Sequence, residues 1–298
     1  MSMSVPEWLA ELGGVARYGT LVRLVERIEL EAAVVSGSVM RDGRGIYSLP
    51  NTDVAVRVAA RLGGVVSMTS AAISHGWGVR TVPDKPHVTV GRGRSLGNRT
   101  KLAHVHWTDL EDHEVENGVT THKVTLRQCL RALPEDEALA VADSALRESG
   151  CHQLLLQVAD EARGPGSPRM RRLADAASEL AANPFESITR SICHSVPGLQ
   201  VKPQVTVRDG AFSARADLVD QRLRIVCEAD SFAWHGSRTA LASDCRRYNR
   251  MVVGGWLVLR FSYEDVMFHP DEVREVLAGV VALAELLVEV GVAGWRAA

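Results

Sequence analysis

The sequence predicts an α/β fold in which a mixed sheet flanked by helices follows a small helical unit and an α+β region. Three observations support this prediction. Apolar residues recur at helical spacing before residue 40 and again after residue 271. Short apolar runs separated by turn residues follow one another between residues 204 and 261. Residues 164–168, Gly-Pro-Gly-Ser-Pro, predict a linker between two domains.

Residues 1–52 predict a winged helix. The expected elements are three helices, at residues 6–12, 20–28 and 29–39, and a hairpin at residues 41–49. Winged helices usually bind DNA by placing the third helix in the major groove. This helix has no Arg, Lys, Asn or Gln between residues 28 and 40, and these are the side chains that contact bases and phosphates. Two interpretations therefore stay open: contact with DNA, or a scaffold that binds protein.

Residues 53–163 predict an α+β region. The expected helices are 54–62, 69–76, 126–133 and 134–149, and the expected strands are 87–90, 102–107 and 120–124. Residues 91–101 form a basic loop between two of these strands, which suits a DNA backbone, although a solvated hairpin loop explains it almost as well. The cations expected to contact DNA flank the third helix or belong to this loop: Arg17, Arg41, Arg44, Arg92, Arg94, Arg99 and Lys101.

Residues 169–298 predict the mixed sheet and its helices. Residues 173–182 have helical periodicity, and Asn183 followed by Pro184 predicts the start of the next helix. The expected strands are 204–207, 214–219, 223–230 and 255–261, the first two joined as a hairpin. The last helix, residues 271–290, is apolar on more than one face, so it packs deeply on the sheet or forms a homodimer contact.

Carboxylates follow the strands of this domain. Glu186 lies on the helix that starts at Asn183, Asp217 lies on one strand, and Glu228 and Asp230 end the next apolar run. An unpaired ionised carboxylate in a core-facing position is costly unless a cation neutralises it. Carboxylates converging from neighbouring strands therefore predict a divalent metal centre of the nuclease type. The alternatives are an ion pair of Glu228 with Arg215 or Arg247, and a turn-capping role for Asp217. Asp230 is a third ligand or caps the following helix, and Arg260 could simply support a carboxylate.

The order of these residues resembles the restriction-endonuclease-like, PD-(D/E)XK, superfamily, in the branch related to the very short patch repair endonuclease. The resemblance covers about residues 183–277 and rests on Asp217, the run 226–230, His235, Asp244 with Arg247, and the run Gly-Trp-Leu-Val-Leu-Arg-Phe at 255–261. The N-terminal half resembles the antitoxin of type IV abortive-infection systems, through the Gly13-Gly14 helix break and residues 44–47 and 70–76.

The first resemblance implies a role for each matching residue. Asp217 and Glu228 would hold Mg²⁺ or Mn²⁺, and Glu186 would orient a metal-bound water. His235 would act as general base or acid, and Asp244 would orient it. The implied contacts with phosphate and DNA come from Arg246, Arg247, Arg250 and Arg260. This chain departs from the pattern because Asp230 replaces the usual Lys and because the spacing from Glu228 to His235 is longer.

Composition limits the possible functions. The formal net charge is −2, so any nucleic-acid surface must come from local clusters. The five cysteines show no CxxC spacing, which favours a reduced cytoplasm over a zinc site or a disulfide framework. We expect no signal peptide, because the N-terminus has neither a basic region nor a long apolar core. We expect no membrane span, because the longest apolar stretch falls short of the roughly 20 residues needed.

Taken together, the residues and the resemblance predict a cytoplasmic, Mg²⁺-dependent DNA endonuclease that acts in repair or defence. An alternative is a non-catalytic DNA-binding regulator or antitoxin with a degenerate nuclease fold. A third interpretation is a protein-interaction module in a defence system. The expected partners are DNA, a second copy of the chain, and a toxin–antitoxin or repair protein.

Overall fold

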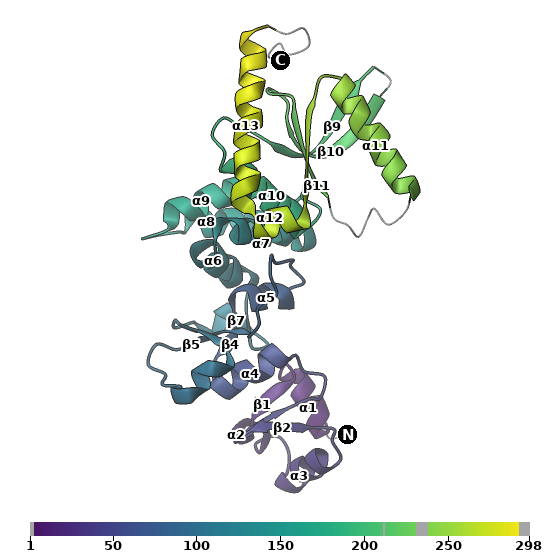
Figure 1. The fold of residues 1–298 in the computed structure, drawn as a ribbon. Helices are drawn as coiled ribbons and strands as arrows, with labels where there is room; N and C mark the ends of the chain where they lie inside the picture. The colour runs from purple at the N-terminus through teal and green to yellow at the C-terminus, as the bar shows by residue number, and fades with distance from the viewer. Residues whose placement is uncertain (1–2, 211, 231–237, 292–298) are drawn as a thin grey trace. The chain divides into compact units, whose positions relative to one another are not determined.

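The computed structural model describes residues 3–210, 212–230 and 238–291 (Figure 1). The chain divides into two compact units, Met1–Ala132 and Leu133–Ala298. Mixed sheets flanked by helices make up both units, which confirms the predicted α/β class. The boundary predicted at residues 164–168 falls inside the second unit. None of the helices within the described ranges is both long and apolar enough to cross a membrane.

The first part of unit 1 has the element order of a winged helix. A three-stranded sheet of order β1-β3-β2 packs on three helices. The elements are α1 (Val5–Glu11), β1 (Val15–Arg17), α2 (Tyr18–Leu21), α3 (Arg27–Val35), β2 (Met40–Gly43) and β3 (Ile46–Ser48). Its core consists of the buried residues Val5, Leu9, Leu21, Leu30, Val39 and Tyr47.

The predicted second helix is wrong, and the third is shifted. Helix α2 ends at Leu21, and α3 begins at Arg27 because Glu26 and Glu29 form a capping box there. Helix α3 ends at Val35, four residues earlier than expected. The hydroxyls of Ser36 and Ser38 donate to the carbonyl of Ala33 in place of a further helical turn.

The rest of unit 1 is a five-stranded sheet of order β6-β5-β4-β8-β7 with helices α4, α5 and α6. Its helices are α4 (Val54–Leu62), α5 (Met68–Ser74), α6 (His122–Ala132) and two 3₁₀ segments, Gly97–Leu102 and Asp112–Glu114. Its strands are β4 (Val65–Val66), β5 (His87–Val90), β6 (His104–Trp107), β7 (Val115–Glu116) and β8 (Val119–Thr120). The strand predicted at 120–124 is wrong beyond Thr120, because α6 begins at His122. Asn117 and Gly118, both at positive φ, turn β7 into β8, and the chain enters α6 directly after β8, where the Thr125 N–H donates to the Thr121 carbonyl.

Unit 2 contains the sheet that carries the predicted site. The sheet has the order β12-β11-β10-β9, with β11 and β12 parallel and the other pairs antiparallel. Its strands are β9 (Lys202–Asp209), β10 (Phe212–Asp220), β11 (Ile225–Asp230) and β12 (Leu257–Ser262). The helices are α7 (Glu135–Ser149), α8 (His152–Asp160), α9 (Ser167–Ala176), α10 (Pro184–His194), α11 (Arg238–Val253), α12 (Tyr263–Phe268) and α13 (Pro270–Glu289).

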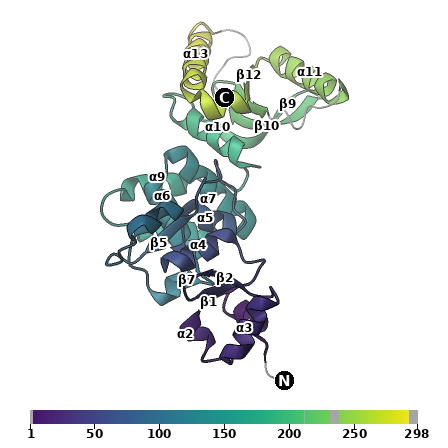
Figure 2. The same ribbon diagram turned by 60° about the horizontal axis from the view of Figure 1, so that its bottom comes forward.

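Helices cover both faces of this sheet, as the two ribbon views show (Figures 1 and 2). Leu218 and Cys227 face α10 and α13, whereas the next residues along the strands, Val219 and Val226, face α11. This period-2 alternation explains why the central strand β11 starts with consecutive buried apolar residues, Ile225, Val226 and Cys227, rather than with apolar residues on one side alone. The sheet is thereby held rigidly between two layers at the position where its carboxylates lie.

Helix α13 buries one face and exposes the other. Val273, Leu277 and Val281 pack into the core, while Leu286 is 54% exposed. The predicted surplus of apolar residues on this helix is confirmed, since Val276, Leu283 and Val290 are also exposed.

A candidate metal site in unit 2

Asp217 and Glu228 lie opposite each other on adjacent antiparallel strands. The register pairs Leu218 of β10 with Cys227 of β11, and this places Asp217 beside Glu228. On its other side Glu228 is paired with Arg260 of the parallel strand β12. Directly opposed side chains share one face of a sheet, and their Cβ atoms lie roughly 4.5–5.5 Å apart. The strands therefore bring two of the predicted site carboxylates together.

Glu186 joins this pair from helix α10. The Asn183 side chain accepts a hydrogen bond from the Glu186 N–H (3.0 Å), which caps the helix at its first turn. The Glu186 carboxylate in turn accepts from the Ala182 N–H (2.9 Å) and from Asn183 Nδ2 (3.1 Å). Burial raises the pKa of Glu186, and the nearby charge of Asp217 raises it further. The capping geometry thus fixes a third acidic group beside the strands.

Gln204 connects Glu186 to Asp217, and the sequence analysis missed it. Its Nε2 donates to Glu186 Oε2 (2.8 Å) and to Asp217 Oδ1 (3.2 Å). Its backbone φ is 55°, a left-handed conformation that is uncommon for residues other than glycine. The hairpin register could have revealed it, because counting back from the turn at residues 208–210 places Gln204 opposite Asp217.

Asp217 is held from two sides. Besides the bond from Gln204, its Oδ2 accepts a hydrogen bond from the Ala229 N–H (3.0 Å), on the strand that carries Glu228. Because each oxygen of this carboxylate accepts from a fixed donor, its orientation is set before anything binds.

Glu228 is the most perturbed carboxyl of the group. It is 2% exposed, and its Oε1 is buried without a hydrogen-bond partner. Burial and the charge of Asp217 raise the pKa of Glu228 to about 8, against the opposing effect of the Arg247 guanidinium. The Arg247 contact is long, at 3.4 Å from Nη2 to Glu228 Oε2. A buried carboxyl with an unpartnered oxygen and a neighbouring acid is the arrangement that a bound cation stabilises.

Arg247 is positioned by helix α11 and by a tyrosine that the sequence analysis also missed. Its guanidinium donates to the Tyr248 hydroxyl (2.6 Å) and to the Arg215 carbonyl (3.2 Å). It also lies 3.7 Å from a carboxylate oxygen of Asp244, one turn earlier on the helix. Tyr248 is buried, and the guanidinium carbons of Arg247 and Arg260 lie 4.6 and 4.2 Å from its ring centroid.

Asp230 has a different environment from Asp217 and Glu228. Its Oδ2 accepts from Arg260 Nε (2.5 Å), and its Oδ1 accepts from the Tyr248 hydroxyl (3.4 Å). Arg260 therefore neutralises Asp230, and the contact of Arg260 with DNA stays a prediction. Arg246 and Arg250 are exposed on α11. His235 lies outside the described residues.

The resemblance implies Mg²⁺ or Mn²⁺ at this position. Among residues 3–210, 212–230 and 238–291, no three His, Cys, Asp or Glu side chains form a ligand set on their own. The pair Asp217 and Glu228 nevertheless fits Mg²⁺, which is often held by one or two carboxylates and keeps waters and substrate phosphates as its other ligands. The buried, unpartnered Oε1 of Glu228 is the structural observation behind this fit.

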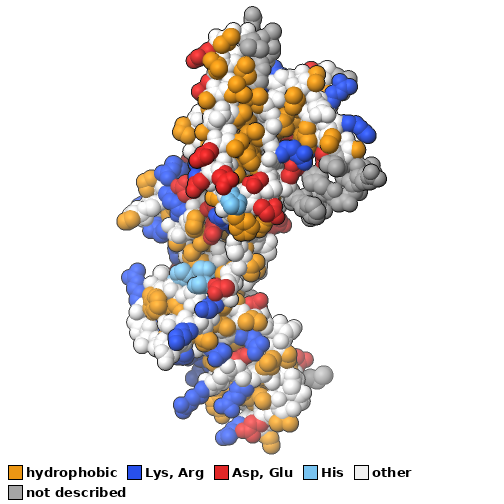
Figure 3. Space-filling view, in the orientation of Figure 1, with side chains coloured by type: hydrophobic (Ala, Val, Ile, Leu, Met, Phe, Trp, Pro, Cys, Tyr) orange, Lys and Arg blue, Asp and Glu red, His pale blue; other side chains and the backbone are white. Residues whose placement is uncertain are grey.

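The cations predicted to contact DNA in unit 1 are mostly solvent-accessible. On the face that Figure 3 shows, Lys and Arg side chains are spread over this unit. Arg92 lies 4.0 Å from Asp109, and Arg99 donates to the Arg61 carbonyl (3.4 Å). Six of the seven are exposed, Arg94 being the half-buried one: Arg17, Arg41, Arg44, Arg92, Arg99 and Lys101.

No protein-family model matches the chain. The chain is similar to two uncharacterized proteins, MT2308 of Mycobacterium tuberculosis strain CDC 1551 and Rv2248 of strain H37Rv. Each is 25% identical over 278 residues, which cover 85% of this chain and 96% of the relative. The similarity therefore extends across both units.

Proposed function

We propose that the protein is a Mg²⁺-dependent DNA endonuclease whose site is built on Asp217 and Glu228. The supporting observation is the pairing of these two carboxylates across adjacent strands, with one buried oxygen of Glu228 left without a partner. Glu186 and Gln204 complete the group from a helix and a third strand. Such an arrangement suits a hard divalent cation and the phosphate it would engage.

Asp217 and Glu228 would hold the cation, which would supply a more acidic water and neutralise charge on the scissile phosphate. Gln204 and the Ala229 N–H orient Asp217 for this task. Glu186, with its raised pKa, would accept a proton or a hydrogen bond from a water at the site. Arg247, which lies 3.4 Å from Glu228, would take the place of the missing Lys and stabilise negative charge on the phosphate.

The test is cleavage of labelled duplex, nicked, mismatched and branched DNA by the purified full chain with Mg²⁺ or Mn²⁺. Asp217→Asn should lower the cleavage rate at least 100-fold, because it removes a charged ligand while preserving size. Glu264→Gln, a matched loss of one exposed carboxylate on α12, should cleave at the wild-type rate. Absence of cleavage on every substrate, or equal cleavage by Asp217→Asn, would refute the proposal.

A second candidate is a DNA-binding regulator or antitoxin that retains the nuclease fold as a scaffold. The observation that favours it is the pairing of Asp230 with Arg260 and the contact of Glu228 with Arg247, which balance two carboxylates without a metal. DNA binding that is equally strong in EDTA and in Mg²⁺, with no cleavage of any substrate, would select this candidate.

A further inference from the structure

Two arginine side chains from distant segments of unit 1 meet at the end of helix α4. Gly63 ends this helix with a left-handed φ of 64°. A Cβ at Gly63 would stand 2.8 Å from Arg17 Nη2 and closer still to Arg94 Nη2. The guanidinium groups of β1 and of the basic loop thus lie side by side over a residue that has no side chain.

Neither of these guanidinium groups has an acidic partner. Within the described part of the chain no carboxylate forms an ion pair with Arg17 or Arg94, and the buried Nε of Arg94 has no hydrogen-bond partner. Other arginines of the same unit are paired, such as Arg57 with Asp42 and Arg27 with Glu31. Two like charges held together without an anion repel each other, and a bound anion removes that repulsion.

The surroundings of the pair can accommodate an anion. Arg17 lines a cavity of about 350 Å³ together with Thr20, Gly63 and Gly64. Gly64 cannot carry a side chain, because a Cβ there would stand 2.3 Å from the Thr89 carbonyl oxygen. Gly64 therefore lets the chain pass close to β5, and Gly63 leaves the space above it to the two guanidinium groups.

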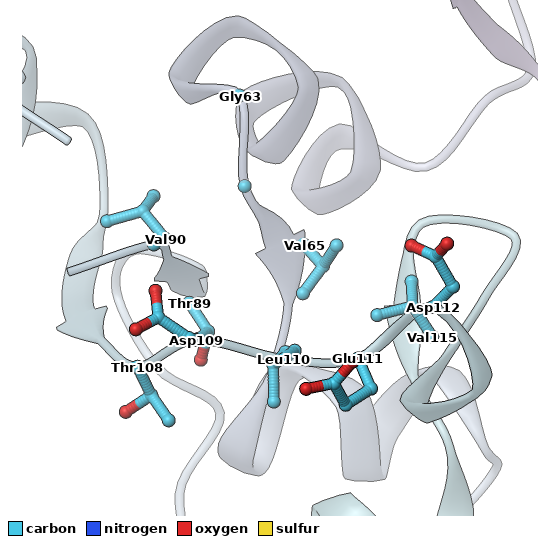
Figure 4. A pocket seen from close by; sticks show the side chains of 12 residues that line it. Gly63, Val65, Thr89, Val90, Thr108, Asp109, Leu110, Glu111, Asp112 and Val115 are labelled. Atoms are coloured by element: carbon cyan, nitrogen blue, oxygen red, sulfur yellow. The ribbon is translucent and has the colours of Figure 1, made fainter. Parts of the chain in front are cut away.

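Gly63 and Gly64 also line a second cavity, which carries acidic side chains. Figure 4 shows this cavity, with Gly63 at the end of α4 and the carboxylates of Asp109, Glu111 and Asp112 among its lining residues. Asp109 accepts a hydrogen bond from the Arg92 N–H (2.9 Å). Within the described residues, none of these three carboxylates forms an ion pair with Arg17 or Arg94, and Asp109 lies instead 4.0 Å from Arg92.

We propose that Arg17 and Arg94 together bind one backbone phosphate of duplex DNA. Guanidinium groups present planar pairs of donors that match the two free oxygens of a phosphodiester. Arg99, which reaches the end of α4 by donating to the Arg61 carbonyl, continues the positive charge. A row of cations suits a polyanion better than an isolated phosphate ion. The site links the winged helix to the 91–101 loop, and it rests on the proposed function only in taking DNA as its ligand.

The experiment measures binding of a fluorescent 20-base-pair duplex to the full chain in EDTA, across a salt titration. Arg17→Gln and Arg94→Gln should each weaken binding about three- to tenfold, and the double variant should lower the slope of log K against log salt by about 0.9, the value for one phosphate. Lys85→Gln removes one exposed charge from the same unit and should bind like the wild type. Circular dichroism verifies that each variant is folded.

The conservative pair Arg17→Lys and Arg94→Lys provides a second measurement, because Lys keeps the charge but loses the paired donors. These variants should retain the salt slope and lose part of the affinity. The proposal is overturned if the Gln variants bind like Lys85→Gln, or if the double variant lowers the slope by about 1.8, the value for two separate phosphates. Because cleavage plays no part in this measurement, failure of the nuclease proposal would leave its outcome unaffected.

Discussion

Replacing Glu228 by Gln should stabilise the metal-free protein at alkaline pH. The folded carboxyl has a pKa of about 8, whereas its usual value is 4.5. At a pH between these two pKa values, the Glu228 carboxyl has lost its proton in the unfolded chain and keeps it in the folded chain. Unfolding then releases a proton, so the free energy of unfolding falls as pH rises through this window. Gln cannot titrate and mimics the protonated form, so it removes this loss.

The difference between a pKa of 4.5 and one of about 8 sets the size of the effect. At about 1.4 kcal/mol for each pH unit, the full loss is on the order of 5 kcal/mol. The carboxyl is almost completely buried, so solvent screening reduces this figure little. We expect a gain of several kcal/mol for Glu228→Gln above pH 8 and almost none at pH 4.5.

Urea unfolding in EDTA at a series of pH values from 4.5 to 9 measures this difference. The free energy of unfolding of the wild type should fall across this pH range, and that of Glu228→Gln should stay nearly constant. Mg²⁺ added at pH 8 should raise the midpoint of the wild type and leave that of Glu228→Gln unchanged, because a bound cation stabilises only the ionised carboxyl. Parallel pH curves for the two proteins would refute the argument, since they would show that Glu228 is already ionised at neutral pH.

Three further predictions concern other polar groups of unit 2. Gln204→Gly should be more stable than Gln204→Ala by about 1 kcal/mol in urea unfolding, because the left-handed φ of 55° strains alanine; equal stability would contradict this. Asp143→Ala should lower the free energy of unfolding by roughly 3–5 kcal/mol. The Arg190 guanidinium is buried and lies 2.6 Å from Asp143, so the substitution leaves it without its counter-ion. A loss below about 1 kcal/mol would contradict this. The Asp230→Asn variant should cleave DNA at a rate within about tenfold of the wild-type rate, because Arg260 already neutralises Asp230. A loss of rate as large as that of Asp217→Asn would indicate that Asp230 is a metal ligand.

The sequence predicted the parts of this fold that depend on local signals. Asn183 and Pro184 predicted the start of α10, and the apolar runs predicted the sheet strands of unit 2. The approach of Asp217 to Glu228 followed from their places on consecutive strands. These features were predictable because helix caps and strand periodicity act over a few residues.

Other features depend on contacts between distant segments and were not predictable in this way. Tyr248 enters the site through the packing of α11 on the sheet. Asp143 reaches Arg190 across two helices that the predicted linker had assigned to different domains. The error at residues 120–124 was local, because the β-branched residues there suggest a strand whereas α6 begins at His122.

The central claim is that Asp217 and Glu228 form a divalent metal site. The most direct measurement is anomalous diffraction from crystals of the full chain equilibrated with Mn²⁺ at pH 8, where Glu228 is substantially ionised. The claim predicts an anomalous peak at roughly 2.0–2.4 Å from one oxygen of each carboxylate, and its loss in Asp217→Asn. An empty site at saturating Mn²⁺, or a peak bound elsewhere on unit 2, would contradict it.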